Sequence, residues 1–344
     1  MSGPFRVRTA AGDRVLEPDA GYTLPHEHLV CDLRARWWGA GDAWTLDPPG
    51  SGVAMEALDE LRHRPQATIR ENLVLSDWYL AATELRHVRD TGGGVVVDVT
   101  VEGLFPEPRL SRRAAELAGL HAVVALGRYL PASLSPAERD EPVESLVDRW
   151  TGQAENGVDG CAIGVIGELG VGPDLSDVER RTLVAGGRVA AATGLAVNVH
   201  VEPGSPRAHE ALDILAGTGA DLGRVAVSHV DAAPDTAALT RLLDRGCYAE
   251  FDLFGRAPAY RFEGRYSADD ETRVDVLCEL ADRGYADRLL LSQDICMRHA
   301  LLHYGGYGYA HLARHVLPVL TERLGAAAVR KMTRVNPLRF LAID

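Results

Sequence analysis

Residues 163–200 read IGVIGELGVGPDLSDVERRTLVAGGRVAAATGLAVNVH and predict a strand, a helix and a second strand in succession. The apolar runs at residues 163–168 and 196–200 have the length of buried strands. Residues 177–193 between them have helical spacing, and Ser176 before them is a helix start signal. Strands and helices in this alternation are typical of parallel strands joined by crossover helices.

The same strand-helix unit recurs along the whole chain. The predicted strands are residues 22–28, 95–100, 121–126, 163–168, 196–200, 225–229, 247–251 and 288–292. The predicted helices are residues 68–91, 112–119, 143–156, 177–193, 207–217, 235–245 and 271–283, with a helical group from residue 308 onward. Eight units indicate a single (β/α)8 TIM barrel, whose usual length is about 250 residues before insertions.

We therefore predict one α/β domain over residues 1–344, with its active site at the C-terminal ends of the strands. The additional length lies mainly at about residues 34–66 and 255–270, which we predict to be loop insertions on that face. A doubly wound open sheet would give the same alternation of strands and helices. It should also carry a glycine-rich phosphate turn, and the chain has neither a GxGxxG nor a Walker A motif.

Composition limits the kinds of partner. The chain has 36 basic and 49 acidic residues and a net charge of −13, which argues against binding to nucleic acid or to an anionic membrane. No apolar run reaches the length of a signal peptide core or of a membrane span, so we expect a cytoplasmic protein. Its five cysteines form no CxxC pair and are interpreted as reduced thiols. The expected partner is a small-molecule substrate, and a homodimer is the default assembly.

Histidines and carboxylates gather at the predicted strand ends. The first strand ends in His26-Glu27-His28, and because side chains alternate along a strand, the two histidines point the same way and Glu27 points elsewhere. The other such residues close the fourth, fifth and sixth strands or follow the eighth: Glu168, His200, His229 and Asp294. In a barrel these ends converge on one region.

Imidazole and carboxylate groups are ligands for zinc and similar divalent ions, and six of them exceed the needs of one tetrahedral site. We therefore predict two divalent metal ions, zinc or alternatively manganese, cobalt or iron. A carboxylate with two oxygens can bridge such a pair, and Glu168 is the candidate bridge. The single lysine, Lys331, lies far from the fourth strand, so a lysine-derived bridge is excluded.

These segments resemble the phosphotriesterase family of the amidohydrolase superfamily, whose members are (β/α)8 metal hydrolases. The resemblance extends over nearly the whole chain and is carried by LPHEH at 24–28, GVIGELG at 164–170, LSQDIC at 291–296 and NPLRFL at 336–341. It implies that His26, His28 and Asp294 hold the more buried metal, that His200 and His229 hold the more exposed one, and that the fourth-strand residue bridges them.

The best-known members of the family have a carboxylated lysine at the bridge, whereas this chain has Glu168, as in a branch of related proteins. Glutamate is shorter, so the strand must approach the metals more closely, and Gly167 and Gly170 would permit that approach. The expected reaction is attack by a metal-bridging hydroxide on an acyl bond of a lactone, a carboxylic ester or an N-acyl amide. Asp294 is the expected catalytic proton acceptor.

Other activities stay open. Phosphotriester hydrolysis is the alternative, as the native reaction or as a side reaction, and a non-catalytic small-molecule binding protein is an alternative of another class. A covalent serine hydrolase is disfavoured because the chain has no GxSxG motif. Predicted substrate contacts are residues that closely follow the third, seventh and eighth strands: Arg128, Tyr129, Asp252, Arg298 and His299. Arg36, Arg256 and Arg265 are further candidates to pair with a substrate carboxylate.

Overall fold

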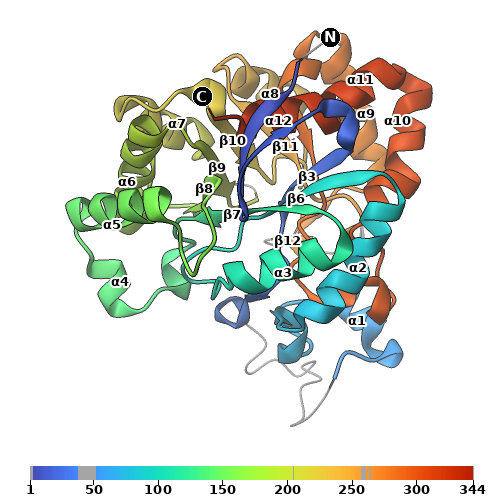
Figure 1. Cartoon of the computed structure of the whole chain (residues 1–344). Coiled ribbons are helices and arrows are strands. Elements are labelled where there is room, and N and C mark those ends of the chain that lie inside the picture. Colours follow the sequence, from blue (N-terminus) through green and yellow to red (C-terminus); the bar gives the residue numbers. More distant parts are fainter. Residues whose placement is uncertain (1–2, 38–51, 204, 257–260, 263–264, 344) are drawn as a thin grey trace.

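The computed structural model describes residues 3–343 except 38–51, 204, 257–260 and 263–264 (Figure 1). Eight parallel strands form one sheet in the order β14-β11-β10-β9-β8-β7-β6-β3. They are β3 (Tyr22–Glu27), β6 (Gly93–Asp98), β7 (His121–Leu126), β8 (Val165–Val171), β9 (Ala196–Val201), β10 (Val225–Ser228), β11 (Tyr248–Phe251) and β14 (Leu289–Leu291). Each overlaps a predicted strand.

Hydrogen bonds beyond the ends of β3 and β14 bring the two edges of this sheet together. The Asp294 N–H donates to the His26 carbonyl oxygen at 3.2 Å, and the His28 N–H donates to the Ile295 carbonyl oxygen at 3.2 Å. The sheet is therefore a nearly closed barrel, and the predicted (β/α)8 architecture is confirmed.

Helices surround the barrel (Figure 1). The longer ones are α2 (Trp78–Asp90), α3 (Pro108–Ala118), α5 (Val143–Asn156), α6 (Asp177–Thr193), α7 (Ala208–Gly217), α8 (Thr236–Leu243), α9 (Asp270–Asp282) and α10 (Leu317–Leu324). The shorter ones are α1 (Leu58–His63), α4 (Pro136–Asp140), α11 (Ala326–Arg330) and α12 (Asn336–Leu341). Helix α6 begins at the predicted signal, because Ser176 and Glu179 form a reciprocal capping box there.

Two features differ from the sequence analysis. The predicted helix at 68–91 begins only at Trp78, because the Asp77 carboxylate accepts the N–H groups of the first turn at 3.0 Å and so caps α2. The residues before it include β5 (Val74–Leu75), which pairs with β4 (Cys31–Asp32). The second feature is an N-terminal hairpin of β1 (Phe5–Thr9) and β2 (Gly12–Leu16), which was not anticipated.

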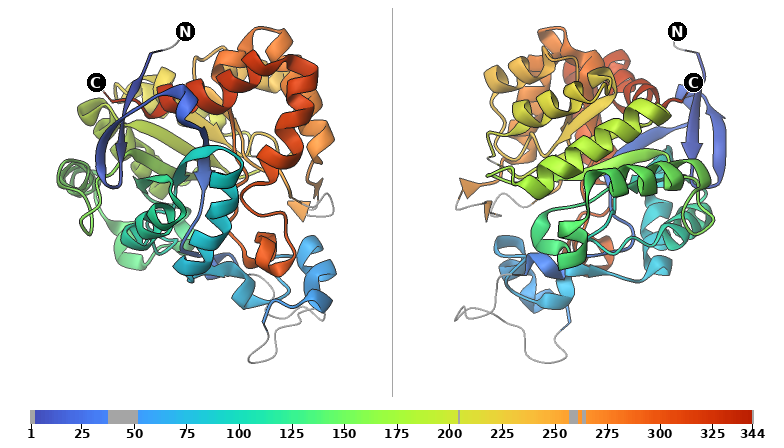
Figure 2. Two further views of the ribbon diagram at one scale, coloured as in Figure 1. Left: turned by 45° about the vertical axis from the view of Figure 1, so that its right-hand side comes forward. Right: turned by 90° about the vertical axis from the view of Figure 1, so that its left-hand side faces the viewer.

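This hairpin lies at the N-terminal end of the barrel, beside the C-terminus of the chain (Figure 2). The Ala10 N–H donates to the carbonyl oxygen of Ala122 near the start of β7, and the Ile343 N–H donates to that of Arg6, both at 2.8 Å. The opposite end of the barrel is therefore left for the long loops that follow the strands.

The two predicted insertions fall only partly within the described residues. The first contains α1, which lies at the end of the molecule away from the two termini (Figure 2), whereas residues 38–51 lie outside the described residues. The second contains the short strands β12 (Arg261–Phe262) and β13 (Arg265–Tyr266), and residues 257–260 and 263–264 lie outside. The Arg265 side chain is likewise not among those described.

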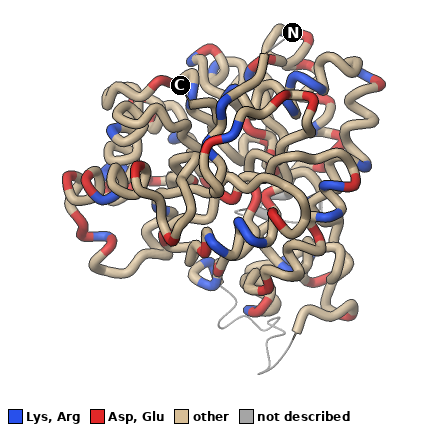
Figure 3. Tube along the Cα trace, in the orientation of Figure 1, with Lys and Arg blue, Asp and Glu red and all other residues tan. Residues whose placement is uncertain are grey.

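Charged residues of both signs are interspersed along the chain trace (Figure 3). Within the described part of the chain, no helix is both long enough and apolar enough to span a membrane.

Strand β8 depends on its glycines. Gly167 has a φ of +101°, and a Cβ atom there would lie 2.0 Å from the carbonyl oxygen of Asn198 on β9. A Cβ atom at Gly170 would lie 2.7 Å from the backbone nitrogen of Leu130. These glycines therefore allow β8 to approach the backbones on both sides of it.

We expect Gly167→Ala to lower the free energy of unfolding by about 3 kcal/mol or more, because the added methyl group meets fixed backbone at a positive φ. Chemical denaturation measures the change. The matched control is Gly152→Ala in α5, where a Cβ atom meets nothing within 4 Å. That change should stabilise the protein by about 0.5–1 kcal/mol. Equal denaturation midpoints for Gly167→Ala and the wild type would contradict the prediction.

Candidate active site

Six side chains from different strand ends converge inside the C-terminal mouth of the barrel. We call them the metal-site cluster: His26, His28, Glu168, His200, His229 and Asp294. All six are buried. Their ligand-type atoms form two groups in which every atom lies within 4.8 Å of the others, one of His26, His28 and Asp294 and one of Glu168, His200 and His229. The structure thus brings together all six residues that the sequence singled out.

Glu168 lies between these two groups. One of its carboxylate oxygens, Oε1, is 2.7 Å from His200 Nδ1 and 3.2 Å from His229 Nε2. The same oxygen is 3.5 Å from His26 Nε2, and Oε2 is 3.7 Å from His28 Nε2. This carboxylate is therefore placed to contact both groups at once.

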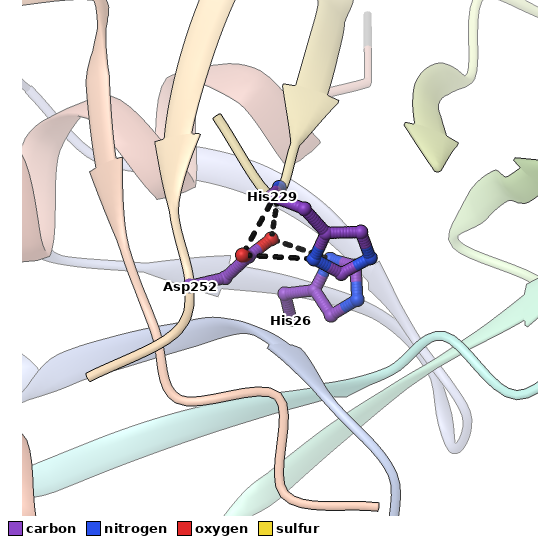
Figure 4. Close-up of side chains that lie close together, drawn as sticks. All are labelled: His26, His229 and Asp252. Carbon is purple, nitrogen blue, oxygen red and sulfur yellow. Dashed lines mark hydrogen bonds and ion pairs between the residues drawn. The ribbon is translucent and has the colours of Figure 1, made fainter. Parts of the chain in front are cut away.

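Three histidines of the metal-site cluster are hydrogen-bonded through Nδ1, so that Nε2 is the ring nitrogen that faces the other cluster residues. His26 Nδ1 is 3.0 Å from Glu250 Oε2, and His28 Nδ1 is 2.9 Å from Thr100 Oγ1. His229 Nδ1 is 3.0 Å from Asp252 Oδ1 (Figure 4). A carboxylate only accepts hydrogen bonds, so His26 and His229 carry a proton on Nδ1 and direct Nε2 inward, where it can bind a cation in place of a second proton.

His200 is turned the other way. Its Nδ1 faces Glu168, while its Nε2 lies 3.4 Å from the Tyr129 hydroxyl and 3.5 Å from Glu202 Oε2. Sequence reasoning did not identify the supporting roles of Glu202, Glu250 and Thr100. For Glu250 a signal existed, because it precedes Asp252 by two residues and so shares its side of the strand.

Asp252 was predicted to contact substrate, but the structure places it behind the centre. Its carboxylate accepts both the ring and the backbone N–H of His229, the latter at 3.1 Å. Although Asp252 also forms a close group with His26 and His229 (Figure 4), it lies on the Nδ1 side of both rings. Its geometry is that of a residue that orients ligands.

Two cluster residues have unusual backbone conformations that other residues hold in place. His229 has a φ of 60° and Asp294 a φ of 48°, in the left-handed region that costs a non-glycine residue about 1–3 kcal/mol. The N–H groups on either side of Asp294, those of Gln293 and Ile295, donate to the Glu27 carboxylate at 2.9 Å. Glu27, which points away from its neighbouring histidines as predicted, thus fixes the turn that carries Asp294.

Buried polar atoms test whether metal ions fit this centre. Among the described residues, His26 Nε2 and Glu168 Oε2 are buried and have no hydrogen-bond partner. Two imidazole nitrogens, His200 Nδ1 and His229 Nε2, lie only 2.7 Å apart. Buried polar atoms are normally satisfied, and an unpartnered one costs about 1–3 kcal/mol. This donor set, with its inward lone pairs, fits divalent cations.

The electrostatic field of the centre also favours cations. Burial disfavours protonation of His26 and His229, but the charges of Asp252 and Glu168 outweigh burial and raise both pKa values, that of His229 to about 10. For Asp294, burial is outweighed by Arg256 and by nearby histidines, which hold the carboxyl pKa well below its usual range. Divalent ions would take the place of the protons that this field attracts.

Of the remaining four residues that were predicted to contact substrate, two have side chains that face a cavity and two have side chains that point away from it. Tyr129 points into the centre, whereas the neighbouring Arg128 points away and pairs with Glu102 at 2.9 Å and with Glu141 at 2.7 Å. His299 lines a cavity, whereas the neighbouring Arg298 donates to the Val74 carbonyl oxygen at 2.7 Å and pairs with Glu71. In each pair, consecutive residues face different sides of the chain.

Two cavities meet at Asp294. The smaller has a volume of about 40 Å³ and is lined by Tyr129, Glu168, His200 and His229. The larger has a volume of about 330 Å³ and lies on the side of Arg256 and His299. Because the smaller cavity has room for only a few water molecules, the larger one is the better place for the body of a ligand.

We expect Asp252→Asn to weaken metal binding by about 10- to 100-fold, because one amide oxygen replaces two acceptor oxygens and no longer fixes the His229 ring. Competition with a coloured chelator measures the affinity. The matched control is Asp244→Asn, an exposed position that accepts a hydrogen bond from Tyr285. Equal zinc affinities for Asp252→Asn and the control variant would show that Asp252 does not orient a ligand.

Comparisons with known proteins agree with this architecture. The phosphotriesterase family model matches residues 6–341. The N-acetyltaurine hydrolase of Rattus norvegicus is 33% identical over 98% of this chain and 97% of its own length. The crystal structure of a resiniferatoxin-binding protein from Rhodobacter sphaeroides has a TM-score of 0.91 at 32% identity and covers 98% of this chain and 95% of that chain.

A second crystal structure, the phosphotriesterase homology protein of Escherichia coli with phosphate in its active site, has a TM-score of 0.78 at 25% identity. It covers 95% of this chain and 100% of that chain. The family match extends over nearly the whole sequence, and several relatives above 30% identity are hydrolases. The chain therefore belongs to the phosphotriesterase family and is a hydrolase of the amidohydrolase superfamily.

Proposed function

We propose that this hydrolase holds two divalent metal ions in the metal-site cluster and cleaves the amide bond of a small N-acyl compound. Glu168 would be shared between the ions, with His26, His28 and Asp294 on one side and His200 and His229 on the other. The observation that carries the proposal is the pair of buried, unpartnered atoms, His26 Nε2 and Glu168 Oε2, between the two groups. Zinc is the first candidate, and manganese, cobalt and iron suit the same ligands.

The chemistry follows from where the side chains stand. Divalent ions bound there would lower the pKa of a water molecule and polarise the acyl oxygen. Asp294 lies where the small cavity meets the large one, so its carboxylate can accept the proton of the attacking water and deliver it to the departing amine. Tyr129, whose hydroxyl lies beside His200, closes the wall of the small cavity.

An N-acyl amide is favoured over the other acyl compounds by the relatives. Several proteins of 30–33% identity are named N-acetyltaurine hydrolase, and they match nearly the full length of this chain. The larger cavity, of about 330 Å³, lies within the range of small-molecule sites, which is about 300–1,000 Å³. Lactone, ester and phosphotriester cleavage by the same centre would be side reactions.

The test combines metal analysis with a substrate panel. Purified protein loaded with zinc should contain about two ions per chain. It should cleave N-acetyltaurine or N-acetyl amino acids faster than lactones and paraoxon-like triesters. Chelation should abolish turnover and added metal should restore it, with circular dichroism showing that the fold persists. Substantially fewer than two ions together with no cleavage of any compound would refute the proposal.

A further inference from the structure

The larger cavity has a charge opposite to that of the protein as a whole. The chain carries a net charge of −13, yet among the described residues that line this cavity the one acidic side chain is Asp294. Its positively charged lining residues are Arg62 and Arg256, and two imidazoles, His63 and His299, also line it. The rest of the wall is largely apolar and includes Phe254, Ile295, Met297 and Tyr307. Such a cavity suits a small molecule that carries a negative charge.

Arg256 places a guanidinium group beside the reacting centre. Its Nη2 donates to the Asp294 carboxylate and lies 3.4 Å from the Asp294 carbonyl oxygen. The backbone before it is anchored, because the Gly255 N–H donates to Asp270 Oδ1 at 3.0 Å. Arg62, which also lines the cavity, is exposed and donates to the Gly305 carbonyl oxygen at 3.3 Å. Guanidinium groups match the paired oxygens of carboxylates and similar oxyanions.

His299 offers a hydrogen-bond acceptor to the same cavity. Asn72 Nδ2 donates to the Pro65 carbonyl oxygen at 3.0 Å, so Asn72 Oδ1 is the atom that faces His299. This oxygen accepts the His299 backbone N–H at 2.9 Å and lies 3.1 Å from His299 Nδ1. Nδ1 must therefore carry the proton of the neutral ring, which leaves Nε2 as an acceptor.

The surroundings keep this ring neutral. Burial, together with the charges of Arg256 and Arg62, lowers the pKa of His299 to about 3. An acceptor at Nε2 pairs with a donor such as the N–H of a secondary amide, and an ester has no such donor.

We propose that this cavity binds the amine half of an anionic secondary amide, with Arg256 and Arg62 on its carboxylate or sulfonate and His299 Nε2 on its amide N–H. The inference rests on the proposed function, because it assumes that the acyl carbonyl lies at the metal-site cluster. Water adds to the acyl carbon, the C–N bond breaks, and the amine nitrogen takes up a proton, so the products are a carboxylic acid and an anionic amine.

The anion is tested with substrates of matched shape. N-acetyltaurine carries a sulfonate, its methyl sulfone analogue is neutral, and N-acetyl-β-alanine supplies the carboxylate. The wild-type holoenzyme should have a kcat/KM at least about tenfold higher for the anionic amides than for the sulfone. The better anion identifies the preferred oxyacid.

We compare the two substrates within each variant, because a loss of folded protein or of bound metal lowers kcat/KM for both substrates equally and leaves their ratio unchanged. The ratio of kcat/KM for anion and sulfone should fall about tenfold in Arg256→Gln and about two- to fivefold in the more exposed Arg62→Gln. Arg188→Gln is the matched control. Arg188 is an exposed arginine of α6 that pairs with Glu144 and does not line the cavity. An unchanged ratio in Arg256→Gln would overturn the assignment of the anion site.

The acceptor is tested by comparing N-acetyltaurine with 2-acetoxyethanesulfonate, the ester of the same shape. The amide-to-ester ratio of kcat/KM should fall about tenfold in His299→Leu. It should largely persist in His299→Gln, whose amide oxygen can still accept a hydrogen bond. A ratio in His299→Leu equal to that of the wild type would remove His299 from the proposal.

Failure of this inference differs from failure of the proposed function. If the holoenzyme cleaves the sulfone as well as it cleaves the anions, the hydrolase function stands and the anion site is wrong. If it cleaves none of them, calorimetry with N-acetyltaurine and the sulfone decides. At least about tenfold tighter binding of the anion would support the site without the reaction. Equal binding of N-acetyltaurine and the sulfone, or no binding of either, would refute both the anion site and the proposed function.

Discussion

Glu168→Ala is expected to lower kcat/KM by about 1,000-fold or more and to leave the protein with fewer than two bound metal ions. Glu168 is the one carboxylate of the cluster that reaches imidazole nitrogens of all four histidines, at 2.7–3.7 Å. Without it, His200 and His229 would lose the carboxylate of their group, and no negative charge would lie between the two groups to hold two cations close together. The rate falls tenfold for each 1.36 kcal/mol by which the transition state is less stabilised, so a loss of several kcal/mol of charge stabilisation lowers kcat/KM by this amount.

The measurements are metal content by mass spectrometry and kcat/KM for the best substrate of the panel. Glu168→Gln separates charge from shape, because it keeps the length of the side chain and removes the charge, and it should resemble Glu168→Ala. Glu116→Ala is a control at an exposed glutamate on α3. Full activity with two ions in Glu168→Ala would show that the carboxylate is not the bridge. Lys331 cannot replace it, because it pairs with the exposed Asp287 at 3.0 Å.

Asp294→Asn is expected to lower kcat by about 10²–10⁴-fold while KM changes much less. The carboxylate lies 3.3 Å from His28 Nε2 at the junction of the two cavities, so it is placed to move a proton from the attacking water to the leaving group. The asparagine side chain keeps the shape of the aspartate and one oxygen that can bind a metal ion, but it has no basic oxygen that can accept the proton. Steady-state kinetics, with metal content measured on the same sample, separates loss of proton transfer from loss of the ion.

Asp287→Asn provides the control for this substitution, because Asp287 is an exposed aspartate that pairs with Lys331. A variant Asp294→Asn that raises KM as strongly as it lowers kcat would assign the residue to binding rather than to proton transfer. A variant with normal kcat would leave Asp294 without a role in the chemical step.

The barrel and its centre were predictable from the sequence because their signals are local. Apolar runs of strand length mark the eight strands, and helical spacing marks the segments between them. In a barrel of parallel strands all C-terminal ends share one face, so histidines and carboxylates at those ends must converge whatever the details of packing. His200 at the end of β9 and His229 just after β10 are examples, since no feature of either segment alone identifies a metal site.

Side-chain direction beyond a strand end was not predictable in the same way. Arg128 and Tyr129 are consecutive, yet one enters an ion-pair network with Glu102 and the other enters the small cavity. The alternation of side chains allows only one of two neighbours to face the centre, but the sequence does not show which. The hairpin of β1 and β2 escaped prediction because each strand is short and partly exposed.

The sequence by itself determined the fold, the order of the candidate ligands and the presence of Glu168, rather than a lysine, in the fourth strand. Only the tertiary structure decided which residues orient those ligands. His26 is supported by Glu250 on β11, which is not a hydrogen-bonded neighbour of β3 in the sheet. Such contacts cross the interior of the barrel, and they depend on strand tilt and register, which are set when the whole sheet closes rather than by any one segment.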